Sequence, residues 1–132
     1  MKFHHIGYAV HSLDKAIESF KYLGCNLVSR CLDETRGIEI AFIADAEGTQ
    51  IELIEPVADG NPVQNILKKI GPAPYHLCFE TTESPSDALT MLAAAGFNEI
   101  RGGGAAPALE GSMVKFFYSS SLGIVELYFV NK

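Results

Sequence analysis

Three kinds of landmark recur along this 132-residue chain at a nearly constant distance. They are a histidine in a strand-like run, a glycine after a helix-like run and a glutamate inside an apolar run. The pairs are His5 and His76, Gly24 and Gly96, and Glu52 and Glu126, separated by 71, 72 and 74 residues. Landmarks in register at one offset indicate an internal duplication. We therefore expect two successive units of similar structure.

The hydrophobic pattern of the first half predicts a strand, a helix and three further strands. These lie at 3–10, 12–23, 25–33, 37–44 and 49–55. Ser12 is expected to cap the helix and Gly24 to end it. A Pro- and Gly-rich connector follows, with one short helical piece at 61–70.

The second half repeats this order after the connector. A strand, a helix and three strands are predicted at 75–81, 84–95, 97–101, 112–118 and 123–130. Ser84 is expected to cap the helix, and the glycines at 102–104 are expected to lie in a flexible loop between strands. The prediction is a single α+β domain over 1–132, built from two βαβββ modules at 1–56 and 75–132 with a connector at 57–74.

Charge and cysteine content exclude several classes of function. Acidic residues outnumber basic ones 16 to 10, and no basic stripe is visible, which argues against nucleic-acid or anionic-membrane partners. Cys25, Cys31 and Cys78 show no CxxC spacing and are expected to be reduced thiols. The first residues resemble neither a signal peptide nor a membrane anchor. We expect a cytoplasmic protein.

Each half places a histidine on its first strand and a glutamate on its last. Glu126 stands inside the apolar run GIVELYFV, and Glu52 inside QIELI. Burying an unpaired carboxylate costs several kcal/mol or forces it to take up a proton, whereas a divalent cation offsets that cost. Packing the two halves about a pseudo-twofold axis would bring two imidazoles and two carboxylates together. The hypothesis is one divalent metal with coordination sites left for a substrate.

Five segments carry a resemblance to a known superfamily: HHIGYAV, DKAIESFKYLG, TQIELIEP, YHLCFE and GIVELY. Through them the chain resembles the vicinal oxygen chelate superfamily, which includes glyoxalase, bleomycin-resistance and dioxygenase proteins. The resemblance is strongest to its methylmalonyl-CoA epimerase and glyoxalase I branches. It implies a glyoxalase-like fold, with a curved mixed sheet around a metal site. It also implies the metal ligands His5, Glu52, His76 and Glu126, and Co, Mn, Ni or Zn as the ion.

The resemblance also implies chemistry through an enolate on a small acyl thioester. A base removes the proton beside a carbonyl while the metal stabilises the developing charge. Glu126 is the first candidate for acid/base catalysis, and Glu39 in GIEIAFI is the second. The expected partners are a small thioester or hemithioacetal substrate and a second copy of the chain in a homodimer.

Three alternatives to an epimerase-like isomerase remain. A lactoylglutathione lyase would move a proton between adjacent carbons of a hemithioacetal. A ring-cleaving dioxygenase would use two histidines and one carboxylate with iron, and the additional carboxylate at Glu52 argues against it. A metal-free relative that sequesters a metabolite or antibiotic would typically have lost the ligand residues.

Overall fold

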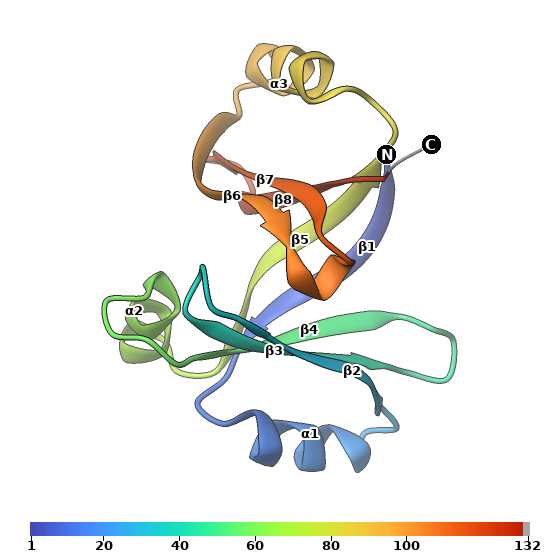
Figure 1. The fold of residues 1–132 in the computed structure, drawn as a ribbon, viewed down its shortest axis with the longest axis vertical. Coiled ribbons are helices and arrows are strands. Elements are labelled where there is room, and N and C mark those ends of the chain that lie inside the picture. Colours follow the sequence, from blue (N-terminus) through green and yellow to red (C-terminus); the bar gives the residue numbers. More distant parts are fainter. Residues whose placement is uncertain (131–132) are drawn as a thin grey trace. The chain divides into compact units, whose positions relative to one another are not determined.

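The computed structural model describes residues 1–130 and divides into two compact units. The N-terminal unit is His5–Tyr75, and the C-terminal unit combines Met1–His4 with the chain from His76 onward. The first residues belong with the second half because the Phe3 ring packs edge-on against Phe79, with centroids 5.8 Å apart. Strands β1 (Lys2–Ala9) and β5 (Ala73–Thr81) therefore each contribute residues to both units (Figure 1).

The N-terminal unit pairs its strands in the order β2-β3-β4-β1. After β1 its elements are α1 (Leu13–Lys21), β2 (Asn26–Asp33), β3 (Ile38–Ala44), β4 (Gln50–Pro56) and α2 (Pro62–Lys69). β1 and β4 run parallel, and the other pairs are antiparallel. The strands and helices predicted for this half are confirmed, with boundaries shifted by at most two residues.

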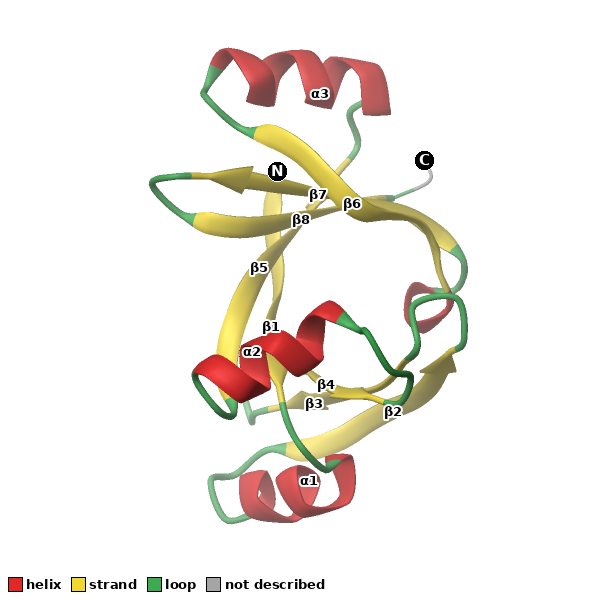
Figure 2. Cartoon of the chain, turned by 90° about the vertical axis from the view of Figure 1, so that its left-hand side faces the viewer, coloured by secondary structure: helices red, strands yellow, loops and turns green. Residues whose placement is uncertain are grey.

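Helix α1 begins where Ser12 caps it, since the Ser12 hydroxyl accepts a hydrogen bond from the Lys15 amide. Figure 2 shows α1 lying along one face of the sheet. Its buried residues Leu13 and Ile17 belong to the core cluster on that face. That face contributes Ala41, Ile43 and Leu53 to the same core cluster. We call it the helix face, and strand alternation places every second residue on the opposite face.

The C-terminal unit has the equivalent strand order, β5-β8-β7-β6. After β5 its elements are α3 (Pro85–Ala94), β6 (Asn98–Ala106), the 3-10 helix η1 (Pro107–Leu109), β7 (Ser112–Ser119) and β8 (Gly123–Phe129). β5 and β8 run parallel, like β1 and β4. Ser84 caps α3 as predicted, and Phe117, Leu127 and Phe129 form the helix face with Ala88. The α+β, glyoxalase-like fold class is thus confirmed.

The loop predicted at 102–104 was wrong, because these glycines lie within β6. The pairing of β6 with β7 skips from Ile100 opposite Phe116 to Gly104 opposite Val114. β6 thus advances four residues where β7 advances two, which is a bulge. Glycine fits here since Gly102 has φ 112 and a Cβ at Gly103 would lie 3.0 Å from the Val114 carbonyl oxygen.

Within residues 1–130, none of the helices has both the length and the apolar character required to cross a membrane.

Candidate metal and catalytic site

His5 and Glu52 form a buried pair in the N-terminal unit. The parallel register places Gly7 opposite Glu52, so His5, two residues earlier, shares the face of Glu52. The His5 Nε2 atom lies 3.6 Å from Glu52 Oε1. The residues are 0% and 5% exposed, so an isolated carboxylate charge would be costly at this position.

Phe42 packs against this His5–Glu52 pair. It lies directly opposite Glu52 in the antiparallel β3–β4 register. Its ring meets the His5 imidazole edge-on, with centroids 5.1 Å apart and an interplanar angle of 81°. Edge-to-face contacts between rings favour one orientation over others. The imidazole is therefore held by packing as well as by Glu52.

The C-terminal unit repeats the arrangement with His76 and Glu126. The His76 Nε2 atom lies 3.3 Å from Glu126 Oε1, and the residues are 5% and 4% exposed. Phe116 lies opposite Glu126, and its ring meets the His76 imidazole edge-on at 5.8 Å and 88°. Each unit thus buries one imidazole nitrogen beside one carboxylate, with a phenylalanine at the equivalent position.

The donor chemistry of these pairs fits a divalent metal ion. Imidazole nitrogen and carboxylate oxygen are ligands for Zn²⁺, Mn²⁺, Co²⁺ and Ni²⁺. A bound cation would balance two carboxylates that are nearly withdrawn from water. The structure therefore brings the predicted ligands together as His5 with Glu52 and as His76 with Glu126.

Glu39 lies on the other face of its sheet. It alternates with Ala41 and Ile43, which are in the core cluster under α1, whereas Phe42 is on the face of Glu52. Both Glu39 oxygens accept hydrogen bonds from Arg30, at 3.1 and 3.3 Å. This interaction, followed by the one with Asp14, raises the pKa of Arg30. The structure does not bring Glu39 together with Glu52.

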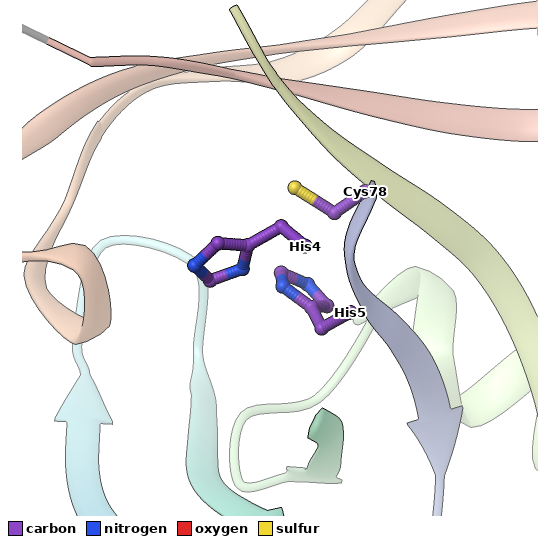
Figure 3. Close-up of side chains that lie close together, drawn as sticks. All are labelled: His4, His5 and Cys78. Carbon is purple, nitrogen blue, oxygen red and sulfur yellow. The ribbon is translucent and has the colours of Figure 1, made fainter. Parts of the chain in front are cut away.

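Cys78 is a neighbour of Glu126 that the sequence pattern did not single out. It is fully buried and lies opposite Glu126 in the β5–β8 register, so both share one face. A ring nitrogen of His4 lies within 4.8 Å of its sulfur, and Figure 3 shows these two side chains. The His4 ring packs edge-on against Tyr128. Strand alternation could have identified Cys78 from the sequence, because it is two residues after His76 and therefore lies on the same face of the strand.

A family comparison agrees with this fold. The model of the Glyoxalase/Bleomycin resistance protein/Dioxygenase superfamily matches residues 4–116. The chain belongs to this superfamily.

Two of the similar proteins are methylmalonyl-CoA epimerases. The chain is 30% identical over 95 residues to the mitochondrial methylmalonyl-CoA epimerase of Dictyostelium discoideum, a match covering 70% of this chain and 56% of that protein. The chain thus spans little more than half the length of this curated relative. The structure of methylmalonyl-CoA epimerase from Mycobacterium tuberculosis is similar in fold, with a TM-score of 0.85 and 24% identity over 99% of this chain and 89% of that one.

A third similar structure contains an acyl-CoA ligand. It is a variant of Streptomyces coelicolor methylmalonyl-CoA epimerase in complex with 2-nitronate-propionyl-CoA. Its TM-score is 0.82 at 21% identity, covering 100% of this chain and 99% of that one. At this level of identity the likeness establishes a shared fold, which covers both units.

Proposed function

We propose that this protein is a metal-dependent epimerase that acts on a small acyl thioester through an enolate, as a methylmalonyl-CoA epimerase would. The observation that carries the proposal is the buried His–Glu pair found once in each unit. Membership of the superfamily and the similarity to the Dictyostelium epimerase support the choice of reaction.

His5, Glu52, His76 and Glu126 would together hold one divalent ion, either Co, Mn, Ni or Zn. Support comes from the two nitrogen and two oxygen donors, which belong to the ligand types these metals prefer. When bound, the ion supplies Lewis-acid stabilisation of the negative charge that develops on a carbonyl oxygen. Phe42 and Phe116 hold the two imidazoles in orientation, and burial keeps the donors dry.

Glu126 would act as the base that removes the proton from the α-carbon of the acyl group. A carboxylate in a poorly hydrated site has a weaker hydration shell to lose, which favours proton abstraction. Glu126 keeps the abstracted proton, and delivery of a proton from a solvent water to the opposite face of the planar enolate would invert the stereocentre. Glu39 is omitted from this scheme because it lies on the helix face and is bound to Arg30.

The test is exchange of the α-proton with solvent. The metal-stripped protein would be incubated in D₂O with methylmalonyl-CoA, with Co, Mn, Ni or Zn added separately, and deuterium uptake followed by mass spectrometry. We expect metal-dependent exchange and interconversion of the two epimers. Glu126→Gln should abolish both, while Glu47→Gln, at an exposed turn, is the matched control.

Two results would contradict the proposal. One is the absence of exchange with every metal, and the other is turnover of a hemithioacetal of glutathione with no activity on the acyl thioester. The second result would identify a lactoylglutathione lyase. Tight binding of a ligand by metal-free protein without turnover would instead favour sequestration.

We also infer a homodimer in a reducing compartment such as the cytoplasm. Support for the dimer comes from exposed apolar residues on the edge strands, including Leu27 and Leu32 of β2 and Ile100 of β6. Support for the compartment comes from three free thiols, Cys25, Cys31 and Cys78. Sedimentation velocity would measure the mass in solution, and a monomer at micromolar concentration would contradict the dimer.

A further inference from the structure

The C-terminal unit holds a second pair of metal-binding side chains in addition to His76 and Glu126. Cys78 lies on β5 and His4 on β1, and both residues belong to this unit. A ring nitrogen of His4 and the Cys78 sulfur are no more than 4.8 Å apart. Cys78 is fully buried, whereas His4 is half-buried, so the pair runs from the interior toward solvent.

Tyr128 packs against His4 on the face that carries Glu126. Tyr128 is two residues after Glu126 on β8, so the two side chains share one face of the strand. The His4 and Tyr128 rings meet edge-on, with centroids 5.2 Å apart and an interplanar angle of 78°. Such contacts favour one ring orientation over others. The His4 imidazole therefore has an aromatic support, as the His5 and His76 imidazoles have.

The two pairs of the C-terminal unit differ in donor chemistry. The Glu126 carboxylate is a hard donor that suits Mn²⁺ and similar ions, whereas the Cys78 thiolate is a soft donor that selects Cu⁺. Bonds to zinc are about 2.3 Å long for sulfur and about 2.0 Å for imidazole nitrogen, so one ion of similar size joins donors up to roughly 4.3 Å apart. The spacing of His4 and Cys78 is compatible with this span.

Charge balance favours a monovalent ion at His4 and Cys78. When Cu⁺ binds, the thiol releases its proton to solvent, and the resulting thiolate cancels the charge of the ion. A neutral Cu⁺–thiolate unit avoids most of the cost of burying a charge at a residue that is 0% exposed. Cu⁺ also accepts two ligands in a line, because its filled d shell imposes no larger coordination number. His4 and Cys78 supply two such ligands.

We propose that His4 and Cys78 form a second metal site, selective for Cu⁺, on the same face as the His76–Glu126 pair. The inference goes beyond the proposed function and does not depend on it. The chain would then sort metal ions by softness, with Cu⁺ on the sulfur pair and the divalent ion on the carboxylates. Cys25 provides a matched control, since it is also buried but packs among apolar side chains under α1.

Anaerobic titration of the protein with Cu⁺ against a chromogenic chelator measures the affinity of this site. We expect one tightly bound Cu⁺ per chain, which Cys25→Ala and Cys31→Ala retain. Cys78→Ala should weaken binding more than about 100-fold and His4→Gln more than about tenfold, because even outer-shell partners of a ligand contribute 10–100-fold. Retention of Cu⁺ by Cys78→Ala, or its loss in Cys31→Ala, would overturn the site.

X-ray absorption of the copper-loaded wild-type protein tests the donors without any substitution. We expect one sulfur and one nitrogen bound to Cu⁺, and a spectrum with sulfur ligands alone would overturn the pairing with His4.

Loading the same protein with Mn²⁺ and then Cu⁺ separates this site from the proposed catalytic centre. We expect one Mn and one Cu per chain by mass spectrometry after gel filtration, and Cys78→Ala should lose only the copper. Cu⁺ binding to a chain that takes up no Mn²⁺ would support the sulfur site while contradicting the proposed function. Stoichiometric displacement of Mn²⁺ by Cu⁺ would show one shared site and overturn the inference.

Discussion

The two His–Glu pairs are built from equivalent positions, but their surroundings differ. In both, the glutamate is opposite a phenylalanine in an antiparallel register, and that phenylalanine meets the histidine edge-on. The residue opposite the glutamate on the parallel strand is Gly7 in one unit and Cys78 in the other. The duplication has thus kept the donor pair and its aromatic support while changing the next neighbour.

The edge strands differ in the same way. β2 carries one extra residue between Leu27 and Ser29 relative to β3, whereas β6 carries two between Ile100 and Gly104 relative to β7. The larger bulge lies against Phe116, the aromatic partner of His76. Bulges are places where strands change direction without disturbing the rest of the sheet. The two units therefore differ in their edge strands and in the residue opposite the glutamate, whereas the His–Glu pair and its phenylalanine are the same in both.

Removing one carboxylate from each pair is the strongest test of their equivalence. We expect Glu52→Gln and Glu126→Gln each to lower metal affinity by more than about 100-fold, because even outer-shell partners of a ligand contribute 10–100-fold. Metal content after dialysis, measured by mass spectrometry, checks this. With metal in excess, only Glu126→Gln should still lack turnover, since it also removes the proposed base. Retention of metal by either variant would break the equivalence.

The bulge in β6 offers a smaller test at the C-terminal pair. In Gly102→Ala the added Cβ would lie 3.2 Å from the Phe116 ring, at a φ of 112. We expect Phe116 to shift and metal affinity to fall about tenfold, as for other residues that support a ligand. Gly111→Ala is the control, because it has φ 80 with no atom within 4 Å of an added Cβ. Equal metal affinity in both variants would show that Phe116 does not position His76.

Substitution of Cys78 tests whether the residue opposite Glu126 affects binding of the divalent metal ion. Since the equivalent N-terminal glutamate lies opposite Gly7, which has no side chain, the C-terminal pair should tolerate loss of the thiol. We expect Cys78→Ala to leave metal affinity within about twofold and to lower the free energy of unfolding by about 1 kcal/mol, because a fully buried side chain is shortened. Metal titration and urea unfolding measure the two effects. A large loss of affinity would make the thiol part of the site.

Local pattern predicted the elements well, because helix caps and alternation are short-range signals. Ser12, Ser84 and Asn61 each cap a helix close to where the pattern begins one. The glycines at 102–104 were misjudged because a run of glycines has no local preference for a strand. Its conformation is decided by pairing with Val114 and Phe116, about ten residues away along the chain.

The candidate site was only partly predictable for a related reason. The donors could be picked out because a charged residue in an apolar run is conspicuous, and the duplication repeats it. The face of a strand was not predictable where both faces are buried, as in IEIAFIA of β3, whose burial runs from Ile38 to Ile43 almost without interruption. Alternation alone then leaves open whether Glu39 or its neighbours share the face of Glu52.

We expect the smallest effect on activity from Glu39→Gln. This variant tests whether Glu39 lies on the face of Glu52 or on the helix face. Because it lies under α1 and its carboxylate is held by Arg30, Glu39→Gln should change kcat less than twofold. The partly exposed ion pair should contribute no more than about 1 kcal/mol, so stability should change little. Arg30→Gln is the matched variant, since it removes the same interaction from the other side. A loss of kcat in Glu39→Gln that Arg30→Gln does not share would assign Glu39 to the chemistry, and the second acid/base group would then have to come from the helix face.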